Sequence, residues 1–337
     1  MIGLESDALP RVSVLMPVRN EGAYLAQSLG GVLAQDYPSE RLEVLVADGM
    51  STDGTRDVIR SYQTTYPNLR LLDNPGLIVS TGLNAAIAVA QGDVIVRVDG
   101  HTVIAPDYVR QCVEELRTTE ADNVGGRMVG IGEGSFARAV TLATSHAFGV
   151  GGARFHYSDE REWVDTVYMG AWRRDVFDRI GLFDEELVRN QDDELNCRLR
   201  DLGGRVLLSP KIKSRYAVRS GPRALFSQYF QYGFWKVRVM QKHPGQMRLS
   251  HFVPPGFVLV LSSLAGLSLV FRVARKPLAL LLLAYSVALS LASLDLSRRG
   301  DHAGLRYVPV VFPLLHLGYG AGFLWGLLRF VQRWKEA

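Results

Sequence analysis

The sequence has few cysteines and no long apolar stretch near its start. Cys112 and Cys197 are the two cysteines among 337 residues, and they form no Cys-x-x-Cys motif, so we expect buried thiols in a reducing compartment. The first residues include Glu5 and Asp7 instead of an apolar run, which predicts that no signal peptide is cleaved. No nucleic-acid-binding motif is present. The N-terminal part is therefore expected to stay in the cytoplasm.

Charged residues are missing from three stretches, 255–271, 277–294 and 307–328. At about 1.5 Å per residue, such helices cover a hydrocarbon layer of about 30 Å, the first two only just. We predict membrane helices, with three buried core helices as the alternative. Lys and Arg flank every stretch, so the positive-inside rule gives almost no orientation. Three spans would leave the C-terminus outside, and a short hairpin or re-entrant segment is the alternative. The excess of 38 Lys and Arg over 34 Asp and Glu suits anionic lipid headgroups better than nucleic acid.

Before residue 250 the apolar residues alternate between strand and helix patterns. Apolar runs at 12–16, 44–47, 69–72 and 94–98 predict strands, and amphipathic helices are predicted between them. Such an alternation is typical of βαβ units and predicts a parallel sheet covered on both faces. Ligands of these sheets bind outside the carboxyl ends of the strands.

Polar residues follow three of the predicted strands. They are Arg19, Asn20 and Glu21 after the first strand, Asp48 after the second, and Asp99 and His101 after the fourth. Residues i and i+2 of a strand share a face, so Asp99 and His101 could converge on one cation while Gly100 admits a ligand. A carboxylate and an imidazole suit Mn²⁺ or Mg²⁺ held jointly with substrate phosphates. A simple turn is the alternative interpretation.

Four segments in this order resemble a family 2 glycosyltransferase. They are Val-Ser-Val-Leu-Met-Pro-Val-Arg-Asn-Glu from Val12, Val-Ala-Asp-Gly-Met-Ser-Thr-Asp-Gly-Thr from Val46, Asp-Gly-His from Asp99, and Phe-Asp-Glu from Phe183 leading into Gln-Asp-Asp-Glu-Leu from Gln191. The resemblance covers residues 10–240 and is greatest to membrane-associated exopolysaccharide glucosyltransferases of the succinoglycan type. It implies a GT-A fold, a nucleotide-diphosphate sugar donor, a divalent cation and inversion at the anomeric carbon.

The resemblance also implies roles for single residues in donor binding. Pro17, Arg19, Asn20 and Glu21 would line the nucleotide pocket. Asp48 would accept hydrogen bonds from the nucleobase, usually uracil, which makes a UDP-sugar the expected donor; a turn or helix-capping aspartate is the alternative. Many members have a further Asp where this chain has Ala47, so the resemblance does not require uracil.

In the same way, Asp99 would contact ribose and metal, and His101 would be the direct metal ligand. The family usually has Asp-x-Asp there, and the imidazole of His101 is a softer ligand that is more compatible with Mn²⁺ than with Mg²⁺. A structural histidine is the alternative.

Asp192 is the candidate general base. Leu195 and Leu199 share one helical face behind it, so Asp192 would stand at a helix N-terminus, where the helix dipole favours the ionised carboxylate. The alternatives are a simple N-cap at Asp192 or catalysis by Asp193 instead. Between the metal and base segments, 168–174 matches the acceptor-side segment of the family, where an aromatic side chain could stack on a sugar; a packed core strand is the alternative.

Residues 225–237 carry an apolar stripe beside basic residues, which predicts an amphipathic helix at the membrane surface. Phe234 stands where processive synthases have the arginine of Gln-x-x-Arg-Trp, which favours addition of a single sugar. We therefore expect an α/β GT-A domain over 1–222, an interfacial helix and linker over 223–250, and about three membrane helices over 251–337.

The resulting hypothesis is a multi-pass cell-membrane enzyme with a cytoplasmic catalytic domain. It would transfer a sugar from a nucleotide sugar to a lipid-linked (polyprenyl) saccharide in exopolysaccharide synthesis. The alternatives are a processive polysaccharide synthase and a non-catalytic membrane scaffold.

Overall fold

The computed structural model describes residues 9–299 and 304–335, and these form two compact units. The first unit contains the chain up to Val129 and Ser158–Tyr216; the second contains Gly130–Tyr157 and the chain from Ala217 onward.

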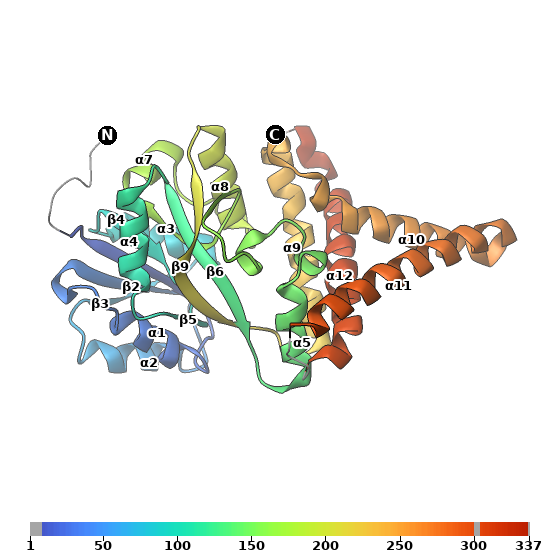
Figure 1. Ribbon diagram of the computed structural model, residues 1–337. Helices are drawn as coiled ribbons and strands as arrows, with labels where there is room; N and C mark the ends of the chain where they lie inside the picture. The colour runs from blue at the N-terminus through green and yellow to red at the C-terminus, as the bar shows by residue number, and fades with distance from the viewer. Residues whose placement is uncertain (1–8, 300–303, 336–337) are drawn as a thin grey trace. The chain divides into compact units, whose positions relative to one another are not determined.

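The strands are β1 (Val12–Val18), β2 (Leu42–Asp48), β3 (Leu69–Asp73), β4 (Val94–Arg97), β5 (Thr102–Ile104), β6 (Asn123–Ile131), β7 (Glu162–Val164), β8 (Tyr168–Arg173) and β9 (Val206–Ala217). The helices are α1 (Leu25–Leu33), α2 (Thr55–Gln63), α3 (Val79–Val89), α4 (Tyr108–Thr118), α5 (Gly134–Thr144), α6 (Ala147–Val150), α7 (Asp175–Ile180), α8 (Gln191–Asp201), α9 (Pro222–Lys242), α10 (Val253–Val270), α11 (Arg275–Ser297) and α12 (Val308–Arg329) (Figure 1).

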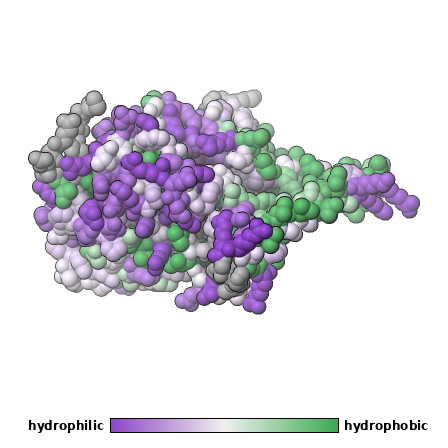
Figure 2. Space-filling view, in the orientation of Figure 1, coloured by the Kyte–Doolittle hydropathy of each residue, from purple (hydrophilic) through white to green (hydrophobic). Residues whose placement is uncertain are grey.

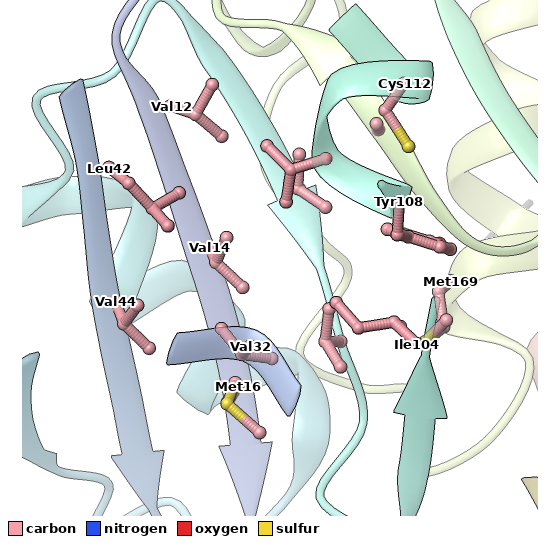
Figure 3. Close-up of a cluster of buried hydrophobic side chains, with 14 of the residues drawn as sticks. Val12, Val14, Met16, Val32, Leu42, Val44, Ile104, Tyr108, Cys112 and Met169 are labelled. Carbon is pink, nitrogen blue, oxygen red and sulfur yellow. The ribbon is translucent and has the colours of Figure 1, made fainter. Parts of the chain in front are cut away.

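The first four strands form the parallel sheet that the sequence predicts, in the order β3-β2-β1-β4. All seven residues of β1 are buried, so both faces of the sheet are covered. On one face the side chains of Val12, Val14 and Met16 meet residues of β2, α1 and α4 (Figure 3). Cys112 lies in this core and Cys197 is also buried, which confirms the predicted buried thiols.

The sheet continues past β4 with strands that the sequence does not predict as partners. β8 pairs with β4 in the antiparallel direction, followed by β6, β9 and β5, so the sheet is mixed. β1 also extends to Val18, beyond the predicted run at 12–16, and includes Pro17. Pro17 is tolerated because the pairing of β1 with β4 ends at Leu15, and proline has no N–H to donate to a neighbouring strand.

The second unit differs from the predicted layout in one respect. Residues 130–157, which the sequence-based division places inside a continuous 1–222 domain, group with the C-terminal helices. The physical reason is packing of α5: Ala139, Val140 and Ala143 share a buried apolar cluster with Phe312 and Leu315 of α12. No local pattern in 130–157 specifies this distant partner.

Three helical segments among the described residues of this unit are long and apolar enough to cross a membrane. They are Leu249–Val270, Arg272–Ser297 and Leu305–Arg329, which contain the three uncharged stretches except for Phe271. The apolar stripe of α9, which the sequence predicts to lie at the membrane surface, packs along α12: the α9 backbone at Phe226, Phe230 and Phe234 lies against glycines of that helix.

Candidate active site

The polar residues predicted for the site follow β1, β2 and β4, at the carboxyl ends of adjacent parallel strands. Arg19 and Asn20 are exposed, whereas Asp48 is completely buried at the end of β2. This edge of a parallel sheet is the usual location of ligand sites in α/β proteins.

Asp48 has one carboxylate oxygen satisfied and one available. Its Oδ2 accepts hydrogen bonds from the backbone N–H of Ser51 at 3.0 Å and from Nη1 of Arg56 at 2.9 Å. Its Oδ1 is buried and has no hydrogen-bond partner in the described part of the chain. Buried acceptors are almost always paired, so this oxygen is suited to a donor group on a ligand.

Asn20 connects the loop after β1 to the loop after β2 through hydrogen bonds. Its Oδ1 accepts a hydrogen bond from the backbone N–H of Thr52 at 2.9 Å, and its own N–H donates to Oγ of Ser51 at 2.8 Å. The backbone of Asn20 has φ = 54°, in the left-handed region where asparagine is favoured among non-glycine residues. Asn20 therefore shapes the loops that border Asp48.

Asp99 and His101 lie in a turn, not on the shared strand face that the sequence predicts. β4 ends at Arg97, and the backbone N–H of Thr102 donates to the carbonyl of Asp99 at 3.0 Å. The tight turn nevertheless keeps the two side chains in electrostatic contact. Burial raises the pKa of Asp99, but the positive charge of Arg97, with His101 adding to it, outweighs burial and leaves the pKa below its ordinary value.

His101 is oriented by Glu21. The Nδ1 of His101 lies 2.9 Å from Oε1 of Glu21, and its ring packs edge-on against Tyr216 at a centroid distance of 5.2 Å. A carboxylate only accepts, so Nδ1 carries the proton and Nε2 is the ring nitrogen that can bind a metal. Metal-binding histidines usually have such a carboxylate on the other nitrogen.

The donor set fits a metal that is shared with a substrate. Among residues 9–299 and 304–335, no three His, Cys, Asp or Glu side chains form a group that could hold an ion alone. Asp99 and His101 would thus supply two ligands, and substrate phosphates and water the others. This is the usual arrangement for Mg²⁺ at phosphate-binding sites.

Arg97 is a site residue that the sequence analysis missed. Its side chain is 6% exposed, and its Nε and Nη2 donate to Oδ1 and Oδ2 of Asp99 at 2.7 and 3.2 Å. Its Nη1 has no hydrogen bond to any residue that the structure describes, and it lies 3.9 Å from Oδ2 of Asp192. Burial lowers the pKa of Arg97, but the two carboxylates overcome this and raise it above its ordinary value. An arginine within the apolar run Val94–Val98 was the available signal, because buried charges need partners.

Asp192 occupies the first turn of α8, as predicted. Asn190 precedes the helix with φ = 62°, and Oδ1 of Asp192 accepts the N–H of Asp193 at 2.9 Å. The side chain is 28% exposed, so one edge meets solvent. The surrounding protein raises the pKa of Asp192, although Arg97 opposes this. Burial is the largest cause of the raised pKa, and it acts against the ionised form that the helix N-terminus was expected to favour.

Segment 168–174 contains a core residue and a residue that contacts Asp99, and its predicted role on the acceptor side stays a prediction. Trp172 is fully buried and packs edge-on against Phe177 and Phe183, so it belongs to the core. Tyr168 instead faces the site: its hydroxyl lies 2.7 Å from Oγ1 of Thr102 and 3.4 Å from Oδ2 of Asp99.

The chain is similar to several characterised proteins. The profile described as Glycosyl transferase family 2 matches residues 13–181. The succinoglycan biosynthesis protein ExoA of Rhizobium meliloti is 31% identical over 98% of this chain and 99% of that protein. A dolichyl N-acetyl-alpha-D-glucosaminyl phosphate 3-beta-D-2,3-diacetamido-2,3-dideoxy-beta-D-glucuronosyltransferase of Methanococcus voltae is 27% identical over 94% of this chain and 97% of its own length.

Among solved structures, the mannosyltransferase PcManGT of Pyrobaculum calidifontis, in complex with GDP-Man and Mn²⁺, superposes with a TM-score of 0.60. The match covers 95% of this chain and 88% of that chain at 23% identity, so it bears on the fold alone. With the profile match and the full-length similarity, the α/β domain has the GT-A fold and the chain belongs to glycosyl transferase family 2.

Proposed function

We propose that this glycosyltransferase moves a sugar, with inversion, from a nucleotide-diphosphate sugar to a lipid-linked saccharide, and that Asp192 is its general base. The observation that carries the proposal is the charge chain Asp99–Arg97–Asp192. It joins the end of β4 to the start of α8, which are far apart in sequence. An inverting transfer needs a base on the acceptor side and stabilisation of the leaving group on the donor side, and Asp192 and Asp99 would serve these two sides.

We assign donor binding to the residues at the carboxyl ends of β1 and β2. The unpaired Oδ1 of Asp48 would accept a hydrogen bond from the nucleobase, and a UDP-sugar is the first donor to test. Pro17, Arg19 and Asn20 would border the nucleotide. We reassign Glu21 from nucleotide contact to orientation of His101, because its carboxylate is held by that imidazole. The PcManGT complex with GDP-Man supports a nucleotide-sugar donor.

In the transfer step, an acceptor hydroxyl oxygen attacks the anomeric carbon. The bond from that carbon to the diphosphate oxygen breaks, and the nucleoside diphosphate leaves with the bonding electrons. Asp192 takes the hydroxyl proton; its raised pKa makes it a stronger base than an ordinary aspartate, and Arg97 favours its ionised form before reaction. Asp99 and His101 would hold Mn²⁺ or Mg²⁺, which would offset the negative charge developing on the diphosphate.

The acceptor is assigned from the relatives and the apolar helices. The name of the Methanococcus voltae relative includes a dolichyl phosphate acceptor, and ExoA acts in succinoglycan biosynthesis. Three long apolar segments suit a membrane-associated chain that meets its acceptor in the bilayer. We propose a cell-membrane location with the catalytic domain in the cytoplasm.

The test is a product assay with the full-length protein in membranes. A panel of UDP- and GDP-sugars is incubated with lipid extract and Mn²⁺, and the lipid products are analysed by mass spectrometry. We expect one donor to add a single hexose to a polyprenyl-linked saccharide. A long polymer would instead indicate a processive synthase, and absence of both transfer and donor hydrolysis would indicate a scaffold.

A further inference from the structure

The three apolar segments of the second unit differ in how much protein covers them. Their mean hydropathies are similar, at 1.9, 2.0 and 1.5, so composition does not separate them. Burial does: 6% of the most apolar window is buried in each of the segments containing α10 and α11, against 44% in the one containing α12. The third segment is therefore covered by protein to a much greater extent than the other two.

The partner of α12 is α9, and their backbones touch. A Cβ added at Gly322 would lie 2.0 Å from the carbonyl oxygen of Phe230, and one added at Gly233 would lie 2.0 Å from that of Tyr319. Further along, Nε2 of Gln241 donates to the carbonyl of Phe330 at 3.0 Å. The contacts advance together along both helices, so α9 and α12 run side by side in the same direction.

Because the two helices are paired in parallel, α12 must have the same orientation and nearly the same depth in a membrane as α9. α9 contains four basic residues and no acidic residue. Lys236 and Arg238 are buried within the protein, whereas Arg223 is exposed and Lys242 is partly exposed. Charged side chains are expensive to place in hydrocarbon, and those of Arg223 and Lys242 can reach an anionic headgroup region. The outer face of α12 remains apolar, with Trp325 and Leu328 exposed, and could dip into the lipid at that level.

α10 and α11 have the dimensions of a membrane-crossing hairpin. Their 18 and 23 residues give lengths of about 27 and 34 Å, against about 30 Å of hydrocarbon. α10 meets α12 in its first turns, where Pro254 and Val258 approach Gly320, and the two helices then lead away from α9 and α12 (Figure 1). Leu269 and Val270, near the far end, are 83% and 75% exposed.

The far end of the hairpin is basic. Arg272, Arg275 and Lys276 are exposed at the turn between the two apolar helices, where Figure 2 shows a hydrophilic tip on a hydrophobic stem. Lysine and arginine at the end of a span reach out to lipid headgroups.

From these observations we propose that only the α10–α11 hairpin crosses the bilayer, while α12 lies with α9 at the membrane surface. The basic tip then lies on the far side of the bilayer. The end of α12 lies on the same side as the first unit, which contains the candidate active site and is called the catalytic unit below. This inference rests on the membrane association proposed above, but not on the proposed chemistry.

The test is site-specific cysteine labelling of the full-length chain in bacterial membranes. Three exposed positions are changed singly: Leu202→Cys in the catalytic unit, Val273→Cys at the tip and Val331→Cys after α12. Each variant is treated with a membrane-impermeant maleimide in right-side-out and inverted vesicles. The native Cys112 and Cys197 are buried and serve as the unlabelled background.

We expect Leu202→Cys and Val331→Cys to react from one side and Val273→Cys from the other. Labelling of Val331→Cys together with Val273→Cys would mean that α12 crosses the membrane, and labelling of all three from one side would mean that the hairpin does not cross. Either result overturns the inference. Recovery of the chain in the soluble fraction would overturn membrane association as well, whereas donor hydrolysis by the same preparations tests the catalytic proposal separately.

Discussion

The catalytic unit and the second unit, called the membrane unit because it contains the three apolar segments, hold their parts in place by different means. In the catalytic unit, buried charges are paired: Arg97 joins two carboxylates, and Asp48 is held by Arg56. In the membrane unit, helices approach until backbones touch at glycines such as Gly322. We thus expect loss of a charge to change the activity of the first unit, and gain of a single methyl group to lower the stability of the second.

The largest effect is expected when the proposed base loses its charge. Asp192→Asn preserves the shape and an oxygen acceptor at the start of α8, so kcat should fall by about 10²-fold or more while donor KM stays similar. Because burial disfavours the charged form of Asp192, its neutral replacement should not lower the Tm. Asp193→Asn is the matched control. The reverse pattern, with loss of turnover only in Asp193→Asn, would move the base by one residue.

The next effect concerns the charge that orients His101. Glu21→Gln should weaken the apparent affinity for Mn²⁺ by about 10- to 100-fold, because Nδ1 of His101 loses its carboxylate partner. The measurement is activity against Mn²⁺ concentration after treatment with EDTA, with the exposed Glu40→Gln as control. His101→Asp should shift the preference from Mn²⁺ toward Mg²⁺. Full activity in EDTA would remove the metal from the proposal.

A single methyl group tests the membrane unit. Gly322→Ala places a Cβ 2.0 Å from a carbonyl oxygen of α9, and overpacking of this kind typically costs about 1–3 kcal/mol. Gly266→Ala in α10 is the matched control, because no atom lies within 4 Å of the added Cβ. Thermal unfolding in detergent should therefore show a lower Tm for Gly322→Ala alone. Equal Tm values would contradict close backbone contact between α9 and α12.

The smallest effect is a shift in the pH profile. Asp192 must be ionised to act as a base, so kcat should decline as pH falls through its raised pKa. Arg97→Met removes the cation that lowers this pKa, so the decline should begin at higher pH than in the parent enzyme. Arg97→Lys retains a positive charge and should shift the profile less. An unmoved profile in a folded Arg97→Met variant would separate Arg97 from Asp192.

The local pattern predicts the parallel half of the catalytic sheet well. The apolar runs at β1 to β4 are short, continuous and separated by amphipathic helices, and this pattern permits few arrangements. The order of those strands also predicts that Asp48, Asp99 and the loop after β1 lie at the same edge of the sheet. The resemblance, rather than periodicity, directed attention to Asp192, whose helix has an ordinary polar composition.

The parts of the fold and the site that the sequence does not predict depend on contacts between distant segments. The pairing of β8 with β4 and the association of α5 with α12 join residues whose own neighbourhoods do not specify a partner. Asp99 and His101 were placed on a strand because periodicity does not mark where β4 ends. One further signal was present and not used: Gly318, Gly322 and Gly326 recur every fourth residue, a spacing typical of closely packed membrane-protein helices.

The parallel pairing of α9 with α12 also affects how the chain is made. Phe230 precedes Gly322 by 92 residues, so at about 5–20 residues per second the ribosome needs roughly 5 to 18 s to supply the partner. During that interval the apolar sides of α5 and α9 have no completed binding surface, whereas the catalytic sheet already has all its strands. In the proposed arrangement the hairpin is synthesised before the last helix completes the unit, so we expect a chaperone or the insertion machinery to act during this interval.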